Sequence, residues 1–215
     1  MTLLSVTDLA IEAGPLSLVD GVTLDVAPGE IVALVGESGS GKSLTALSIM
    51  GLLGNGLTVT GGRITFDGTD LTTLSQDGLR ALRGEDLAMI FQEPVSSLNP
   101  LVPVGHQVAE SLITHGHATP AEAFEQAIDM LRRVGIPQPE RRATQLPTEL
   151  SGGMCQRVMI AAALISKPRL LIADEPTTAL DVTVQAGILA QLRALADDHG
   201  MAVIFVSHDL AVIHQ

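Results

Sequence analysis

The chain has 215 residues, of which 46% are hydrophobic, and this length suits one large α/β domain or two small ones with a sizeable core. A net charge of −12 and only 2% aromatic residues speak against nucleic-acid binding, which normally uses a basic surface and stacking rings. A single cysteine excludes an internal disulfide, and no apolar run is long enough to span a bilayer. We therefore expect a chain that is soluble by itself and reaches a membrane only through a partner.

The first third of the chain is rich in strand-like segments. Apolar runs punctuated by glycine and proline predict strands at residues 3–11, 22–26, 31–35 and 63–66. Directly after the third run, the apolar spacing predicts a helix over residues 43–50. Glycine-containing turns are expected at residues 54–56, 61–62 and 67–68. Together these elements predict a small antiparallel β layer beside an α/β core.

The rest of the chain changes from a helical stretch to alternating helices and strands. A strand is expected over residues 87–92, followed by a loop because Pro94 and Pro100 rule out a regular helix there. Helical spacing from 105 to about 142 predicts an all-helical insertion, about residues 93–155. Beyond it we expect helices at 152–166, 182–196 and from 209, and strands at 170–173 and 202–206. Without repeats or linkers, residues 1–215 are interpreted as one domain.

A glycine-rich loop between the predicted strand 31–35 and the next helix carries the clearest chemistry. It satisfies the pattern G-x-x-x-x-G-K-[ST] and consists of Gly36, Glu37, Ser38, Gly39, Ser40, Gly41, Lys42 and Ser43. Its glycines bring backbone N–H groups close to phosphate oxygens, and the helix that follows adds the positive end of its dipole. Lys42 would reach the β- and γ-phosphates and Ser43 would ligate Mg²⁺. The alternative, an accidental Gly/Ser-rich turn, does not account for the strand and helix on either side.

Two further motifs carry acids and a helix cap. The apolar strand before Asp174 and Glu175 would place both carboxylates at a nucleotide crevice. There Asp174 would hold Mg²⁺ through water and Glu175 would polarise the attacking water, although an ordinary strand-to-loop transition has the same pattern. Ser151, Gly152 and Gly153 open a helix and either present N–H groups to an anion or form a simple N-cap.

Taken together, these motifs resemble the ATP-binding cassette family over essentially the whole chain. The resemblance implies an α/β P-loop NTPase (RecA-like) core with a flanking antiparallel β layer and an α-helical insertion, with ATP and Mg²⁺ as cofactors. It implies that Leu150-Ser-Gly-Gly153 reaches the γ-phosphate held by a second cassette. In the family's pattern Gln92 senses the γ-phosphate and joins Ser43 and Asp174 at the metal, and His208 is the switch histidine. Asp181 belongs to the loop that crosses the dimer in this pattern.

The stretches at 89–100 and 173–185 look like the oligopeptide, dipeptide and nickel importers of bacteria. This resemblance implies an ATP-hydrolysing subunit that energises the import of peptides or related small solutes through ATP-driven dimerisation and hydrolysis. Its implied partners are a second ATP-binding subunit, transmembrane permease subunits at the cytoplasmic side of the membrane and, indirectly, a solute-binding protein, with no nucleic acid. The alternatives are a non-transport cassette ATPase that acts on ribosomes or DNA, and a catalytically inactive nucleotide-binding partner.

Four features depart from the family's pattern. Cys155 replaces a basic residue or glutamine in the first turn of the signature helix, where a thiol pKa can fall, or is a tolerated substitution. The stretch 14–18 lacks the aromatic residue that stacks on adenine in many cassettes. The family continues well beyond the position of Gln215, so we expect a C-terminally truncated chain. His115-Gly-His117 is either part of a metal site or, with no further ligand nearby in sequence, a solvated loop.

Overall fold

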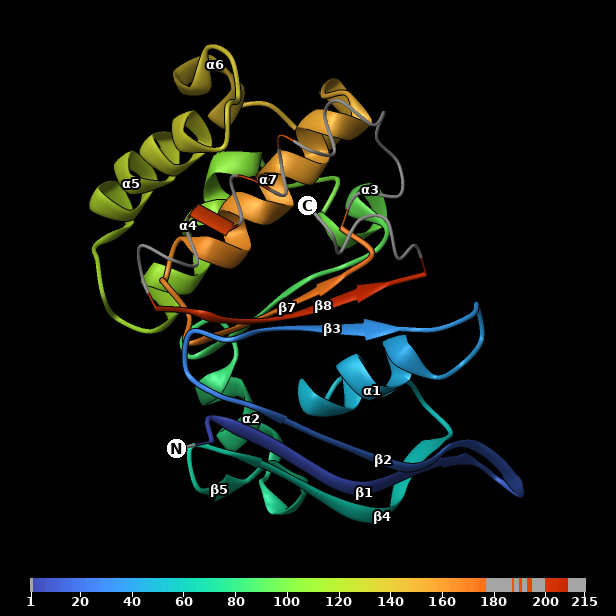
Figure 1. Ribbon diagram of the computed structural model, residues 1–215. Coiled ribbons are helices and arrows are strands. Elements are labelled where there is room, and N and C mark those ends of the chain that lie inside the picture. Colours follow the sequence, from blue (N-terminus) through green and yellow to red (C-terminus); the bar gives the residue numbers. More distant parts are fainter. Residues whose placement is uncertain (1, 177–186, 188–189, 191–192, 195–199, 209–215) are drawn as a thin grey trace.

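Two β-sheets of different kinds form the frame of the molecule (Figure 1). The structure, a computed structural model, describes residues 2–176, 187, 190, 193–194 and 200–208. An antiparallel sheet has the order β2-β1-β4-β5, with β1 at Leu4–Ala13, β2 at Leu16–Val26, β4 at Leu57–Phe66 and β5 at Thr69–Asp70. A parallel sheet has the order β3-β8-β7-β6, with β3 at Ile31–Val35, β6 at Leu87–Ile90, β7 at Leu170–Asp174 and β8 at Ala202–Ser207.

Helix α1, at Lys42–Ile49, lies between the two sheets (Figure 1). Its buried side chains, among them Ala46 and Ile49, join a core cluster with Leu4 and Val26 of the antiparallel sheet and Ile204 of the parallel sheet. The turn η1, at Leu71–Thr73, and helix α2, at Gln76–Leu82, contribute to the same cluster. Because α1 is packed on both sides, its eight residues are held together as one unit between the sheets.

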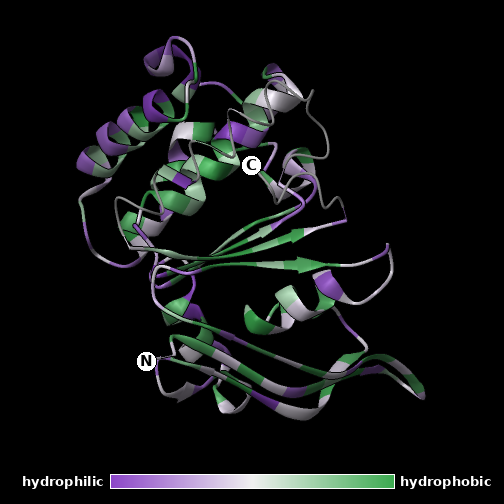
Figure 2. Ribbon diagram, in the orientation of Figure 1, coloured by the Kyte–Doolittle hydropathy of each residue, from purple (hydrophilic) through white to green (hydrophobic). Residues whose placement is uncertain are grey.

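A second core cluster lies on the other face of the parallel sheet, under a group of helices (Figure 1). These elements are α3 at Pro94–Ser97, α4 at Val104–Thr114, α5 at Pro120–Arg133, α6 at Pro139–Ala143, η2 at Pro147–Glu149 and α7 at Gly152–Leu164. The strands of the parallel sheet are almost entirely hydrophobic, whereas α5 mixes hydrophilic and hydrophobic residues (Figure 2). This is the expected contrast between strands covered on both faces and a helix with one face in water.

The α/β fold expected from the sequence is confirmed, and so are most of its elements. Strand β3 has the expected bounds, whereas β2 and β4 begin several residues earlier than the apolar runs alone indicated. The expected loop at 93–100 contains one helical turn, α3, because Pro94 stands at its first position, where proline needs no N–H partner. The expected helices at 182–196 and from 209 fall mainly or wholly outside the described residues.

The turn expected at Gly61-Gly62 is wrong, because both glycines lie inside β4. They stand opposite an irregularity in β1, where the register shifts between Thr7 and Ala10 and Asp8 has a φ of 49°. Gly62 has a φ of +81°, and a Cβ there would lie 2.4 Å from the carbonyl oxygens of Thr7 and Asp8. The glycines therefore form part of a β-bulge, which, like a turn, requires a residue with positive φ.

We expect Gly62→Ala to destabilise the protein more than Gly68→Ala. The two glycines have nearly the same φ, +81° and +80°, but a Cβ at Gly68 would meet nothing within 4 Å. Gly68→Ala should cost about 1–2 kcal/mol for its left-handed backbone alone. Gly62→Ala should cost about 1–3 kcal/mol more, because the bulge must open to relieve the clash. Urea denaturation of both variants measures the difference, and equal losses would show that the bulge does not require a glycine.

Candidate active site

The glycine-rich loop joins the end of β3 to the start of α1. Gly39 and Gly41 have φ values of +82° and +87°, which only glycine adopts easily. A Cβ on Gly41 would lie 2.8 Å from Cγ2 of Val19, and one on Gly36 would lie 2.8 Å from Oγ of Ser40. The loop is therefore tight, and it packs directly against β2. Val19 is distant in sequence from the loop, so the motif alone does not predict this contact.

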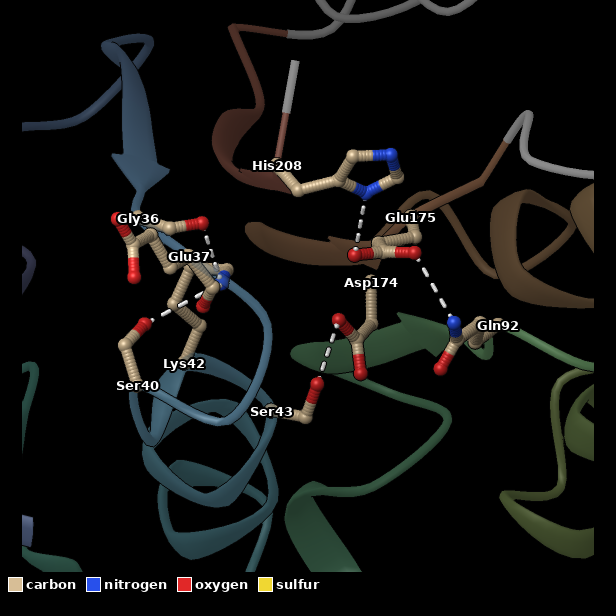
Figure 3. A network of polar contacts seen from close by, with 9 residues as sticks. All are labelled: Gly36, Glu37, Ser40, Lys42, Ser43, Gln92, Asp174, Glu175 and His208. Atoms are coloured by element: carbon tan, nitrogen blue, oxygen red, sulfur yellow. Dashed lines mark hydrogen bonds and ion pairs between the residues drawn. The ribbon is translucent and has the colours of Figure 1, made fainter.

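Lys42 lies inside this loop, with only 8% of its surface exposed. Its Nζ donates hydrogen bonds to the carbonyl oxygens of Gly36, at 2.8 Å, and Glu37, at 2.7 Å, and to Oγ of Ser40, at 3.2 Å (Figure 3). A buried ammonium requires such partners. Its positive charge is thereby held next to the hollow of the loop, where an anion can replace the carbonyl groups.

Ser43 and Asp174 join the loop helix to the end of β7. The Ser43 hydroxyl donates a hydrogen bond to Oδ1 of Asp174 at 3.1 Å (Figure 3). Asp174 is 5% exposed, and its burial, together with the nearby charge of Glu175, raises the pKa of its carboxyl group, against the opposing effects of Ser43 and Lys42. Hydroxyl and carboxylate oxygens are the ligands that Mg²⁺ prefers, so these two residues fit such an ion.

Glu175 brings together residues that follow three different strands (Figure 3). Gln92, after β6, donates from Nε2 to Oε2 of Glu175 at 2.9 Å, and Nδ1 of His208, after β8, lies 2.9 Å from Oε1. The backbone N–H of Glu175 donates to Val206 of β8, and its φ is 45°, a costly value for a residue with a side chain. Strain of this kind, held by surrounding contacts, is typical of functional sites.

The glycine-rich loop, Gln92 and Glu175 line one hollow of about 190 Å³. Its walls are the loop on one side and two polar side chains on the other, and they comprise Ser38, Gly39, Ser40, Gly41, Lys42, Ser43, Leu44, Gln92 and Glu175. The other two loop residues, Gly36 and Glu37, take part through their carbonyl contacts with Lys42. The structure thus gathers most of the site residues that the sequence indicated.

The residues of the signature motif stand apart from this hollow. Ser151 caps α7, because its Oγ accepts a hydrogen bond from the backbone N–H of Met154 at 3.3 Å, and it is exposed, as is Gly152. The described residues that line the hollow do not include Ser151, Gly152 or Gly153. Asp181, the other residue that the family's pattern assigns to a dimer contact, lies outside the described residues.

Of the two interpretations of Cys155, the structure supports a tolerated substitution and contradicts a lowered thiol pKa. The side chain is buried, at 1% exposure, and its sulfur donates to the carbonyl oxygen of Pro147 at 3.4 Å. Burial raises the pKa of the Cys155 thiol, which outweighs its position in the first turn of α7. Cys155 is a small core residue of this helix.

The histidines at 115 and 117 lie in the turn after α4, where His117 is exposed, as expected of a solvated loop, whereas His115 is half-buried. His115 Nε2 lies 2.9 Å from the carbonyl oxygen of Arg83, and His117 Nε2 lies 2.6 Å from Oε2 of Glu85. Both rings therefore pack on the turn that precedes β6. Among the described residues, no group of three histidine, cysteine, aspartate or glutamate side chains is arranged to hold a metal ion.

A parallel sheet whose strand β3 runs into the Lys42 loop, with acids at the end of β7, defines a P-loop nucleotide-binding fold. Residues 19–178 match the protein family described as ABC transporter, and the chain belongs to this family. Across the described residues, no helix is long and apolar enough to cross a membrane.

The chain is similar to curated transport proteins. It is 53% identical to the peptidoglycan transport ATP-binding protein YejF of Agrobacterium fabrum, over 99% of this chain and 40% of that protein. It is 48% identical to the dipeptide transport ATP-binding protein DppD of Haemophilus influenzae, over 99% of this chain and 66% of that protein. The chain thus spans between 40% and 66% of the length of these two relatives.

A solved structure has a closely similar fold. The dimeric ATP-binding cassette MJ0796, in a post-hydrolysis state bound to ADP and Pi, superposes with a TM-score of 0.87 at 30% identity. This match covers 97% of this chain and 89% of the other.

We expect Asp174→Asn to stabilise the nucleotide-free protein at about pH 7. Burial raises the folded-state pKa of Asp174 above its unfolded value, so its favourable contribution is present below the unfolded pKa and is lost as the pH rises through the folded one. At neutral pH the carboxylate therefore lowers the free energy of unfolding, whereas a neutral amide can still accept from Ser43.

Thermal denaturation between about pH 4 and pH 8 tests this expectation. The gain in Tm should be largest at neutral pH and should shrink as the pH falls. Asp20→Asn, on an exposed position of β2, is the control and should leave Tm unchanged. A lower Tm for Asp174→Asn at neutral pH would contradict the assigned cost of burying this carboxylate.

Proposed function

We propose that the chain is the ATP-hydrolysing subunit of a membrane importer for peptides or related small solutes, and that residues 1–215 form one nucleotide-binding domain with a helical insertion at about 93–155. One observation carries the proposal. The Lys42 loop, Gln92 and Glu175 line one hollow, and Asp174 and His208 are hydrogen-bonded to two of its lining residues, Ser43 and Glu175. Membership of the ABC transporter family supports it.

In this proposal the loop from Gly36 to Ser43 binds the phosphates of ATP. The ammonium of Lys42 exchanges its bonds with the carbonyl groups of Gly36 and Glu37 for bonds with β- and γ-phosphate oxygens. Ser43 and Gln92 would supply oxygen ligands for Mg²⁺, and Asp174 would hold the ion through water; a bound ion would neutralise part of the phosphate charge. The buried carboxyl of Asp174, with its raised pKa, gains a counter-charge when such a cation is present.

Glu175 is the proposed catalytic residue. Its carboxylate would accept a hydrogen bond from a water molecule whose oxygen attacks the γ-phosphorus, while the bond to the bridging oxygen of ADP breaks. His208, hydrogen-bonded to Oε1 of Glu175, would orient this carboxylate, and Gln92, which forms part of the hollow, would sense the γ-phosphate. The inactive alternative offers no reason for this convergence, and the acidic charge of −12 disfavours ribosomes or DNA as partners.

The complete site would be shared between two copies of the cassette. Ser151 is exposed and stands apart from the hollow of its own chain, so the N–H groups at the start of α7 are available to a nucleotide held by a second subunit. The dimeric state of the similar MJ0796 cassette supports this arrangement. Asp181 would lie at the same dimer contact.

The segment after Gln92 is the proposed contact with transmembrane permease subunits at the cytoplasmic side of the membrane. It exposes Val95, at 54%, and Leu101, at 83%, and exposed apolar side chains on an ordered segment are typical of protein interfaces. Gln107 of α4 fixes this segment, because its side chain accepts from the N–H of Asn99 at 2.8 Å and donates to two carbonyl groups, of Asn99 at 2.9 Å and Val102 at 2.7 Å. A solute-binding protein would act indirectly, through the permease.

Glu175→Gln should retain ATP binding and lose turnover, because an amide cannot polarise water but still fills the same space. Lys42→Ala should lose tight binding, because the loop's ammonium is removed. Calorimetry with ATP and a phosphate-release assay separate the two effects, and size-exclusion chromatography should show that Glu175→Gln forms a dimer with ATP.

Glu125→Gln, an exposed position on α5, is the matched control and should behave as the native chain. A native rate of hydrolysis in Glu175→Gln would exclude Glu175 as the catalytic residue. Unchanged ATP affinity in Lys42→Ala would refute the phosphate site.

Ser151→Arg should leave ATP binding by the monomer intact and abolish cooperative hydrolysis. In the proposed dimer, Ser151 contacts the nucleotide that is bound by the opposite subunit. Mixing this variant with Lys42→Ala provides the decisive measurement. In a mixed dimer one composite site lacks both elements and the other keeps both, so part of the activity should return. If mixed dimers demonstrably form and no activity returns, the shared site is wrong.

A further inference from the structure

Arg83 closes the end of the phosphate-loop helix α1. Its Nε donates to the carbonyl oxygen of Met50 at 2.7 Å and its Nη2 donates to that of Gly51 at 2.9 Å. Carbonyl groups at a helix C-terminus have no partner within the helix, and a cation there is favoured by the helix dipole. The fit is close, because a Cβ on Gly51 would lie 2.6 Å from Leu79 and 3.1 Å from the guanidinium of Arg83.

The backbone of the same residue is tied to the helical insertion. The carbonyl oxygen of Arg83 accepts a hydrogen bond from Nε2 of His115 at 2.9 Å, and since a carbonyl can only accept, Nε2 carries the proton. His115 is the C-terminal cap of α4, and its side chain is only 14% exposed. Two residues further on, Glu85 is paired with His117 at 2.6 Å. The turn at 83–86 is thus attached to the end of α4 at two points.

The contacts of Arg83 and Glu85 with the two histidines lie at the end of the parallel sheet where its strands begin, whereas the hollow lies at the end where they finish. The strands β3 and β6 run in the same direction, the Lys42 loop follows the end of β3, and the turn at 83–86 precedes the start of β6. His115 therefore cannot contact a nucleotide bound at the loop. Helix α1 connects the two ends of the sheet, because it begins with Lys42 and Ser43 and ends next to the guanidinium of Arg83.

We propose that Arg83 is a positioning residue that couples phosphate binding at the Lys42 loop to the position of the helical insertion. The proposal rests on the proposed function. A phosphate that draws Lys42 out of its carbonyl contacts shifts α1, whose eight residues are packed between two sheets and move as one unit. The two-pronged bond of Arg83 passes this shift to the turn, and His115 passes it to α4.

The coupling matters because α4 packs against α7, the helix that begins next to Ser151. Nucleotide binding at the start of α1 therefore affects the position of the signature residues, and their position affects nucleotide binding. Thermodynamic linkage makes this influence reciprocal, so a contact that moves the helical insertion also changes nucleotide affinity. A residue that only stabilised α1 would affect the stability of the fold but would not link these two regions.

The ring of His115 reports the coupling directly. Histidine ring signals in NMR spectra of the full chain are followed while a non-hydrolysable ATP analogue and Mg²⁺ are added, and His115→Gln identifies the signal. In the native chain the His115 signal should shift with the same concentration dependence as binding measured by calorimetry. In Arg83→Met this response should be lost, and Kd for the analogue should rise about tenfold, or about 1.4 kcal/mol.

Two further variants separate coupling from loss of charge or of fold. Arg80→Met removes an arginine from α2, the helix that ends just before Arg83. Among its described contacts, Arg80 pairs only with the exposed Asp77, so this variant should respond as the native chain. Arg83→Lys keeps the charge but lacks the fork that reaches both carbonyl groups, so its His115 response should be intermediate. This variant, with the native chain, tests the proposal even if Arg83→Met does not fold.

The outcomes are distinguishable. A native chain that binds the analogue without any response at His115 overturns the coupling, as does a full response in both Arg83→Met and Arg83→Lys. A native chain that does not bind the analogue overturns the proposed function and this inference with it.

Discussion

A buried ammonium at the end of a parallel strand is the constraint on which the other features of this structure depend. Lys42 is 8% exposed and has its hydrogen bonds satisfied by its own loop. The loop can fold so tightly only because glycines occupy its positions of positive φ and leave room for β2. The helix that Lys42 begins packs against both sheets, so the position of the ammonium is tied to the packing of both layers.

The balance of charge around the hollow determines what can enter it. One ammonium faces two carboxylates, and burial and mutual repulsion raise the pKa of Asp174. Phosphates alone would add negative charge to a site that already holds an excess of it. A divalent cation held by the oxygens of Ser43 and Asp174 would reverse this imbalance, so nucleotide and cation are expected to bind together.

Sequence reasoning was most successful where neighbours in the chain determine the structure. The loop at 36–43, with an apolar strand before it and a helix after it, needs no distant contact to be recognised. The glycine pair at 61–62 was misjudged because a bulge and a turn require the same backbone freedom. Cys155 was ambiguous because its helical position favours a thiolate whereas burial, a property of tertiary packing, disfavours it. The contacts of Arg83 with α1 and α4 join segments 32 or more residues apart and leave no local pattern.

The arrangement of Glu175 shows how two residues that follow neighbouring strands hold the carboxylate of the proposed catalytic residue. Each carboxylate oxygen already has a hydrogen-bond partner, Gln92 on one and His208 on the other. Each oxygen of an ionised carboxylate can accept more than one hydrogen bond, so a water molecule can donate to Glu175 while both bonds hold the group in place. Gln92 stands immediately before the segment that exposes Val95 and Leu101, so a protein bound there would act on the first of these bonds. A partner at that surface would therefore reach the carboxylate through Gln92, the residue that both donates to Glu175 and immediately precedes the segment.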